Sequence, residues 1–270
     1  MSLPPLRPEE KERDMYIVKS NSLIQQSRFS LSLEEQRILL YLISKIKPTD
    51  KEMKRQEIDI KDYCKVCGIS LSDIPAMYDF IKKTIQRLAD KSFWLLMDDK
   101  KEHLLRWIDK AVISKNEGKV AVRLNEDLLP YLIQVKKNYT QYALASVVVM
   151  KCKYSPRLYE ILKSYLHFYD RKSYETFKEF SIDKLMTVLG IEEKTKQTYR
   201  KNITMFKKNV IEKAIEEINY YTDIGVKIDY IRTKRTITGI RFNIVRLSMK
   251  DQMDNADRAY NELDGKEVEV

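Results

Sequence analysis

The stretch Ile58-Asp59-Ile60-Lys61-Asp62-Tyr63-Cys64-Lys65-Val66-Cys67-Gly68-Ile69 has a counterpart later in the chain, at a constant offset of 122 residues: Phe180-Ser181-Ile182-Asp183-Lys184-Leu185-Met186-Thr187-Val188-Leu189-Gly190-Ile191. In each copy a polar residue, Asp59 or Ser181, stands where a helix N-cap is favoured. In each copy a glycine, Gly68 or Gly190, suits the left-handed position that follows a helix. The pattern predicts the same short helix twice, in two copies of one unit.

The sequence around the two short helices repeats as well. An amphipathic helix is expected before each of them, over residues 32–46 and 155–168, and a longer one after each, over residues 73–91 and 198–222. Apolar residues recur every three or four positions in these segments, which is the spacing of one buried helix face. In the long helix of the second copy this face consists of Tyr199, Ile203, Phe206, Val210, Ala214 and Ile218.

Both copies end in segments typical of β-strands. The expected strands are 93–97, 104–113 and 120–124 in the first copy and 226–230 and 240–244 in the second, with polar turns at 98–101, 116–118 and 232–235. Helix, short helix, turn, long helix and hairpin is the order of a winged helix, whose third helix normally enters the major groove of DNA. We therefore expect an α+β fold, mostly α, of two tandem winged-helix domains related by internal duplication.

Composition divides the chain into four parts. We expect a disordered arm over residues 1–15, a first winged-helix domain over 16–137, a second over 138–248 and a disordered acidic tail over 249–270. The whole chain carries +10, and the tail carries −4 from three cations and seven carboxylates, so the rest carries +14. This basic body favours a polyanionic partner, although the same charges could serve solubility alone.

The composition argues against membrane and secreted proteins. No stretch reaches the roughly 18 consecutive apolar residues of a membrane helix, and the first residues have no apolar core of signal-peptide length. Three cysteines, an odd number, fit a reducing compartment. We expect a cytoplasmic bacterial protein that makes no membrane contact.

Candidate catalytic and metal-binding groups are few. Cys64 and Cys67 form a CxxC, but they take the places of Met186 and Leu189 in the second copy, so we expect core residues and not zinc ligands. Two isolated histidines cannot supply the histidine pair of a rolling-circle nickase, and six scattered glycines build no phosphate-binding loop. We expect no enzyme activity, no metal and no cofactor.

Cations in the long helix of the second copy lie off its apolar face and in its N-terminal half, the part of a recognition helix that meets base edges. Arginine and lysine suit guanine and phosphate oxygens, and threonine tolerates several bases. A solvated helix face is the alternative. The candidate DNA-binding residues of this helix are Arg200, Lys201, Thr204, Lys207 and Lys208.

Two further groups of cations are candidates for DNA contact. One, in the turn between the last two strands, suits phosphate or minor-groove contact, or else keeps an edge strand from pairing. The other lies in the long helix of the first copy, which begins with acidic residues, so we expect phosphate contacts there. The first group is Arg232, Lys234 and Arg235, and the second is Lys82, Lys83 and Arg87.

Several stretches between residues 16 and 246 resemble the initiator Rep proteins of iteron-bearing plasmids that replicate by the theta mode. They are Val18-Lys19-Ser20-Asn21-Ser22-Leu23-Ile24, Phe29-Ser30-Leu31-Ser32-Leu33-Glu34-Glu35-Gln36-Arg37, Lys153-Tyr154-Ser155-Pro156-Arg157-Leu158-Tyr159-Glu160-Ile161-Leu162, Phe206-Lys207-Lys208-Asn209-Val210-Ile211 with Ala214-Ile215-Glu216-Glu217-Ile218-Asn219, and Gly239-Ile240-Arg241-Phe242-Asn243-Ile244. One departure is Lys213, which stands where the family has proline and leaves the helix unbroken there.

The resemblance implies two winged helices with a division of labour. Monomers of such proteins bind direct repeats at the origin and help to open an AT-rich region, with the second domain dominating base recognition. Dimers bind an inverted repeat and repress the initiator's own gene. The resemblance also implies host replication proteins as partners. A plain transcriptional repressor of the same fold is the alternative to an initiator.

The first copy contains a strand that is apolar on both faces, residues 93–97. A hairpin built on it needs cover, from a partner chain or from residues 128–142 of the same chain. We expect a monomer–dimer equilibrium in which the first domain supplies the dimer surface. The linker near residues 138–150 would then move between the two states.

Overall fold

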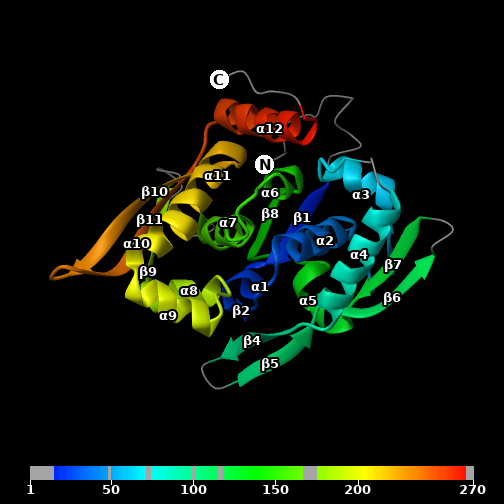
Figure 1. The fold of residues 1–270 in the computed structure, drawn as a ribbon, viewed down its shortest axis with the longest axis horizontal. Coiled ribbons are helices and arrows are strands. Elements are labelled where there is room, and N and C mark those ends of the chain that lie inside the picture. The colour runs from blue at the N-terminus through cyan, green and yellow to red at the C-terminus, as the bar shows by residue number, and fades with distance from the viewer. Residues whose placement is uncertain are drawn as a thin grey trace.

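The computed structural model describes residues 15–47, 50–70, 74–98, 101–114, 118–166 and 175–265. Two helical units, each with its own strands, lie toward the two ends of the long axis, and helix α7 (Ser155–Tyr165) lies between them (Figure 1). Their buried apolar residues form one continuous cluster. Apart from Met15, the expected arm over residues 1–15 lies outside the described residues.

Three helices of the first unit begin and end where the sequence predicts. Helix α2 (Leu33–Ser44) has a capping box, in which Ser32 and Glu35 each accept a hydrogen bond from the other's backbone N–H. Helix α3 (Ile60–Val66) is capped by Asp59, and Gly68 follows at a φ of 63°. Helix α4 (Ile74–Ala89) follows as the long helix.

The first unit holds two three-stranded sheets. One has the order β2 (Ser27–Arg28), β4 (Ser92–Asp98), β5 (Lys101–Arg106), and the other β3 (Gln56–Asp59), β7 (Lys119–Leu124), β6 (Ile108–Ser114). The single strand expected over 104–113 is therefore wrong. It is divided at Trp107, whose buried ring stacks on Phe93 and meets Phe29 edge-on, so the chain turns from one sheet into the other.

The second unit repeats the first with one simpler sheet. Helix α7 stands in the place of α2, and α8 (Ile182–Val188) is capped by Ser181 and followed by Gly190 at a φ of 68°. Strands β10 (Ile224–Thr233) and β11 (Thr236–Arg246) form the expected hairpin. A strand that we did not predict, β9 (Glu175–Ser181), pairs antiparallel with β11.

The long helix of the second unit is interrupted, which corrects the expected continuous helix over 198–222. It consists of α9 (Glu193–Lys201), α10 (Ile203–Phe206), the π-helical segment η5 (Lys207–Glu212) and α11 (Lys213–Tyr221). Asn202 breaks it, with φ −134° and ψ 81°, and its side chain accepts a hydrogen bond from the N–H of Met205. Asparagine favours such caps over helix interiors. The helix continues through Lys213, as its sequence indicates.

Residues 138–150 are packed structure and not a free linker. Strand β8 (Tyr139–Ala143) pairs antiparallel with β1 (Tyr16–Ser20), and the short helix α6 (Ala145–Val148) follows, buried throughout. Helix α1 (Asn21–Gln26) continues from β1, while a 3-10 turn (Glu126–Leu128) and α5 (Leu129–Leu132) precede β8. The segment expected to be mobile is thus held by β-pairing to the start of the chain.

Most of the acidic tail is a helix, which corrects the disorder expected over 249–270. Helix α12 (Met249–Leu263) begins after Ser248, whose hydroxyl accepts from the N–H of Asp251. Ala259 and Asn255 on its inner face are buried. Lys250, Asp251, Asp254 and Asp264 are exposed, so this net negative segment buries its inner residues while it leaves four of its charges in water. Residues 266–270 lie outside the described residues.

Buried charged side chains of α7 join the two units. Arg157 of α7 is 4% exposed, lies over the ring of Phe29, and donates to the carbonyls of Ser27 and Val188. Glu160, one turn later, accepts from Lys19 of β1. A buried charge is tolerated only when it is paired or hydrogen-bonded, so these contacts tie α7 to the start of the first unit and to the turn after α8.

Candidate nucleic-acid interface

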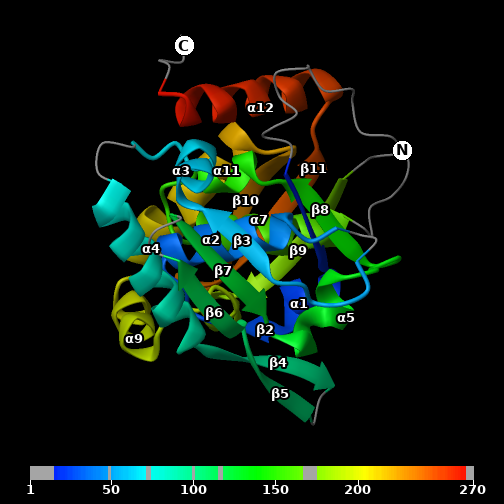
Figure 2. The same cartoon turned by 90° about the vertical axis from the view of Figure 1, so that its right-hand side faces the viewer.

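The two long helices face the same side of the molecule. Helices α4 and α9 both lie along the left-hand side in Figure 2, and Figure 1 shows them spaced along the long axis. In a winged helix this is the helix that enters the major groove. One duplex running along this side would therefore meet both units.

Arg200 is exposed on α9 and is held by two carboxylates. Its Nε lies 2.7 Å from Asp183 Oδ1, and its Nη1 lies 2.7 Å from Glu193 Oε1. These hydrogen bonds raise the pKa of the guanidinium above its ordinary value. The guanidinium is thus fixed in one orientation at the surface, and DNA acceptors would have to replace these carboxylates to engage all of its donors.

Three of the other predicted residues are exposed around the break at Asn202: Lys201, Thr204 and Lys208. Met205, which the sequence reasoning missed, is 42% exposed between them. It occupies an off-stripe position on α10, and this spacing could have identified it. A thioether at a groove surface suits the methyl group of thymine, because apolar contact is how that base is distinguished.

Lys207 is only half-exposed and contacts the wing. Its Nζ lies 4.1 Å from the centre of the Tyr230 ring on β10, and the Tyr230 hydroxyl contacts Glu212. Burial, followed by Glu212, raises the pKa of Tyr230 to about 12, so the phenol stays neutral at any physiological pH. Lys207 therefore joins the helix to the wing through a cation–π contact.

The tip of the β10–β11 hairpin carries the three predicted cations. Arg232, Lys234 and Arg235 are exposed, and Lys234 adopts a left-handed φ of 56° in the turn. A register shift between Ile231 and Arg232 twists the hairpin just before the tip. The hairpin reaches the end of the long axis of the molecule in Figure 1, clear of the rest of its unit.

The predicted cations of the first unit differ in their surroundings. Lys82 and Lys83 are exposed on α4. Arg87 lies 3.7 Å from the buried carboxylate of Glu35, which also accepts from Lys91 at 2.6 Å. A buried carboxylate needs such partners, so Arg87 has a structural task that the sequence did not indicate.

Cys64 and Cys67 lie in the core of the first unit, as predicted from their repeat partners. Both are buried and free, and burial raises the pKa of Cys67 to about 12. Within the described part of the chain, no group of three or more His, Cys, Asp or Glu side chains is placed to hold a metal ion. In the same part, no helix is long and apolar enough to cross a membrane.

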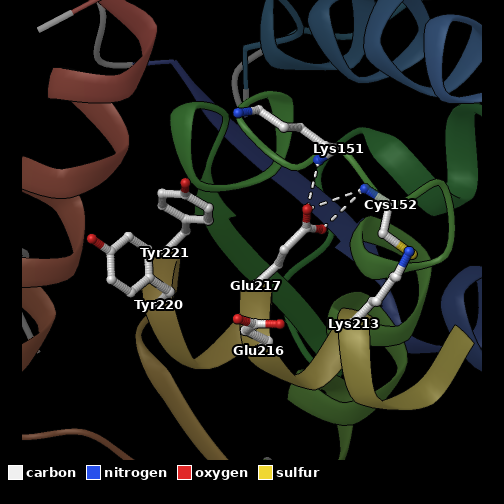
Figure 3. A pocket seen from close by; sticks show the side chains of 7 residues that line it. All are labelled: Lys151, Cys152, Lys213, Glu216, Glu217, Tyr220 and Tyr221. Carbon is white, nitrogen blue, oxygen red and sulfur yellow. Dashed lines mark hydrogen bonds between the residues drawn. The ribbon is translucent and has the colours of Figure 1, made fainter. Parts of the chain in front are cut away.

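A surface pocket of about 520 Å³ lies away from the candidate interface, between α11 and the segment before α7 (Figure 3). Glu217 accepts hydrogen bonds there from the backbone N–H groups of Lys151 and Cys152. The carboxylate of Glu217 thus links α11 to the segment before α7.

Two winged helices with exposed cations on one side define a tandem DNA-binding class of protein. Residues 16–163 match the family model of the initiator replication protein, first winged-helix domain, and residues 181–244 match the model of the second. The chain therefore belongs to the initiator replication protein family. Helix α12 lies outside both matches.

Curated relatives agree with this assignment. A replication initiation protein of Escherichia coli is 24% identical over 221 residues, which is 80% of this chain and 66% of the relative. The PI protein of Escherichia coli is 23% identical over 164 residues, 58% of this chain and 53% of the relative. The chain thus spans just under two thirds of the first relative and about half of the second.

A solved structure shares the fold. The crystal structure of Pi initiator protein in complex with iteron DNA has a TM-score of 0.65, with 18% identity, over 87% of this chain and 99% of that chain. At this identity the likeness establishes the arrangement of the two winged helices.

Proposed function

We propose that this chain initiates plasmid replication by binding direct repeats at the origin as a monomer. The observation that carries the proposal is that α4 and α9, which both carry exposed cations, lie along one side of the molecule (Figure 2). The similar Pi initiator protein was solved with iteron DNA. Each unit would place one helix in a major groove, and grooves on one side of a duplex recur every 10–10.5 base pairs or so.

The second unit contributes most of the base recognition in this proposal. Arg200, Lys201, Thr204 and Lys208 line its exposed helix surface, and the wing tip adds phosphate or minor-groove contacts. Lys82 and Lys83 of the first unit position the chain on the backbone. The chain acts by binding alone and recruits host proteins for the chemistry of replication.

Nuclease footprinting on the DNA that flanks the gene tests the proposal. We expect the full chain to protect tandem repeats of about two helical turns each, beside an AT-rich segment that becomes sensitive to single-strand reagents. Protection of a single inverted repeat over the promoter, with no tandem sites, would favour the alternative, a plain repressor. Supercoiled plasmid should stay unnicked in the same reactions.

We also propose that a dimer of the chain represses its own gene, with the first unit as the dimer surface. Strand β4 packs Phe93 and Leu95 inward, while Trp94 is 47% exposed. Trp94 pairs across the sheet with Leu104 of β5, which is 55% exposed. Both side chains lie on one face of this sheet, so the same face of a second copy could pack on it and cover them.

A further inference from the structure

Helix α12 is attached to the second unit at the end of α11. Asn255, 4% exposed, donates through Nδ2 to the carbonyls of Asn219 at 3.0 Å and Thr222 at 2.7 Å. These are carbonyls at the C-terminal end of a helix, which have no partner within the helix itself. Arg258 then accompanies Asn255, donating to its Oδ1 and lying over the ring of Tyr220. Helix α12 is therefore bound to the second unit by specific hydrogen bonds that cap the C-terminal end of α11.

The other end of α12 rests on the first unit. A Cβ placed on Gly68, just after α3, would lie 2.8 Å from the carbonyl oxygen of Leu263 and 3.0 Å from its Cα. The backbones of the two segments therefore touch, which only a glycine allows. Glu262 also pairs with Lys151, at 2.6 Å, in the segment that leads from α6 to α7. One helix thus contacts both units, as its place across α11, α6 and α3 in Figures 1 and 2 shows.

The equivalent glycine of the second unit is a docking point as well. A Cβ on Gly190 would lie 1.7 Å from the carbonyl oxygen of Phe29, which belongs to the first unit. The turn after the short helix is therefore occupied in both copies, by Phe29 in one and by Leu263 in the other. In both figures α12 lies above α7, and β2, next to Phe29, lies below it. The two attachments are thus on opposite sides of α7.

We propose that α12 is a strap that sets the angle between the two units, and thereby the spacing at which α4 and α9 meet DNA. Without α12, the units are joined at Phe29 and at the buried contacts of Arg157 and Glu160, and they could hinge about these contacts. The second attachment removes that freedom before DNA is bound. Preorganisation of two linked contacts raises the affinity for a site that engages both and leaves the affinity of each single contact unchanged. The part of this inference that concerns DNA rests on the function proposed above.

Matched variants separate the strap from general destabilisation. Gly68→Ala introduces a side chain at positive φ and pushes on Leu263. Gly118→Ala introduces the same side chain at a φ of 62°, with nothing within 4 Å of the new Cβ. The two variants carry the same backbone strain, and only the first one touches α12. A chain that ends at Ser248 removes the strap altogether.

Interdomain geometry is measured first, without DNA. In a Cys152→Ser background, spin labels at Lys110→Cys and Glu175→Cys report the distance between the units by double electron–electron resonance. We expect one narrow distance distribution for the full chain and for Gly118→Ala, and a broadened one for Gly68→Ala and for the chain ending at Ser248. A distribution that stays narrow in the last two would overturn the proposal. If the shortened chain does not fold, the two glycine variants decide the matter.

DNA binding is measured second, with a duplex of roughly 21 base pairs, two helical turns, selected from a random library by the full chain. A shortened duplex keeps only the contact of the second unit. Loss of the strap should weaken binding to the long duplex by about tenfold and change binding to the short one by less than about twofold. Equal weakening on both duplexes, or none on either, would contradict the strap. If the full chain selects no duplex, the proposed function fails, while the distance measurement still tests α12.

Discussion

Lys208 and Lys82 are both exposed lysines on long helices, one in each unit, and they make a matched pair. We expect Lys208→Ala to weaken binding to the target duplex more than Lys82→Ala, because a lost base contact costs about 1–3 kcal/mol whereas a phosphate contact acts uniformly across sequences. Titration of each variant with target and random DNA checks this. Equal losses on the two DNAs for Lys208→Ala would remove the second unit from base recognition.

Arg200 offers a charge-conserving test at the same helix. Arg200→Lys keeps the positive charge beside Asp183 and Glu193 but loses the fork that binds guanine through two hydrogen bonds. We expect weaker binding to target DNA by about 1–3 kcal/mol, with binding to random DNA close to that of the unaltered chain. Unchanged binding to both DNAs would show that Arg200 supplies charge alone.

Asp223 links stability to pH. Burial by itself would raise the pKa of this carboxyl, but Lys163 and the Tyr159 hydroxyl, 2.8 Å away, outweigh it and hold the pKa below the ordinary 3.8. The stabilisation is therefore present above pH 3.8 and is lost as pH falls below it. We expect Asp223→Asn to cost about 1–2 kcal/mol in urea unfolding at pH 7 and markedly less at pH 3. A cost that does not change with pH would contradict this assignment.

At the scale of elements, strand β5 carries the prediction for the dimer. Leu104→Lys places a charge in the middle of the proposed contact, opposite Trp94. We expect the dimer dissociation constant to rise roughly tenfold or more, as for a central interface residue, in sedimentation of the full chain. Val112→Lys, an exposed apolar position on the other sheet, is the control and should leave the constant unchanged. Similar effects of both variants would argue against a β5 interface.

The repeat predicted the elements whose signals are local. The caps Ser32, Asp59 and Ser181 and the glycines Gly68 and Gly190 need only their own neighbours, so α2, α3 and α8 were confirmed close to their expected ends. The break at Asn202 was missed because the apolar spacing continues across it, from Tyr199 to Phe206. Asn202 itself, a good N-cap residue three positions before Met205, was the available signal.

Elements that depend on distant partners could not be predicted from spacing. Strand β9 contains five charged or hydroxyl residues among seven, and it is a strand because β11 offers it an edge. The charge of residues 249–270 predicts disorder, yet Ser248 caps helix α12 and Ala259 packs inward, which helical spacing could have indicated. Arg200 pairs with Asp183 of α8, and Arg87 with Glu35 of α2, so the sequence predicted the exposure of the two arginines and not these partners.

For the whole molecule, the +14 charge of the body predicts the salt dependence of DNA binding. We expect the logarithm of affinity to fall linearly with the logarithm of salt concentration, with a slope of about −0.9 per phosphate contact. The double variant Lys82→Ala with Lys83→Ala should make the slope less steep by nearly 2. A nearly flat dependence for the unaltered chain would count against DNA as the partner.

The contact between Leu263 and Gly68 has a consequence for folding during synthesis on the ribosome. A ribosome releases the first unit long before it has made α12, and 195 residues separate the two contact points. At a translation rate of about 5–20 residues per second, the turn at Gly68 lacks its contact with Leu263 for roughly 10 to 40 s after it emerges from the ribosome. Every newly made chain therefore passes through a period in which both units can be folded while their mutual angle is still open. In a chain truncated before residue 263, the angle between the two units would remain variable permanently.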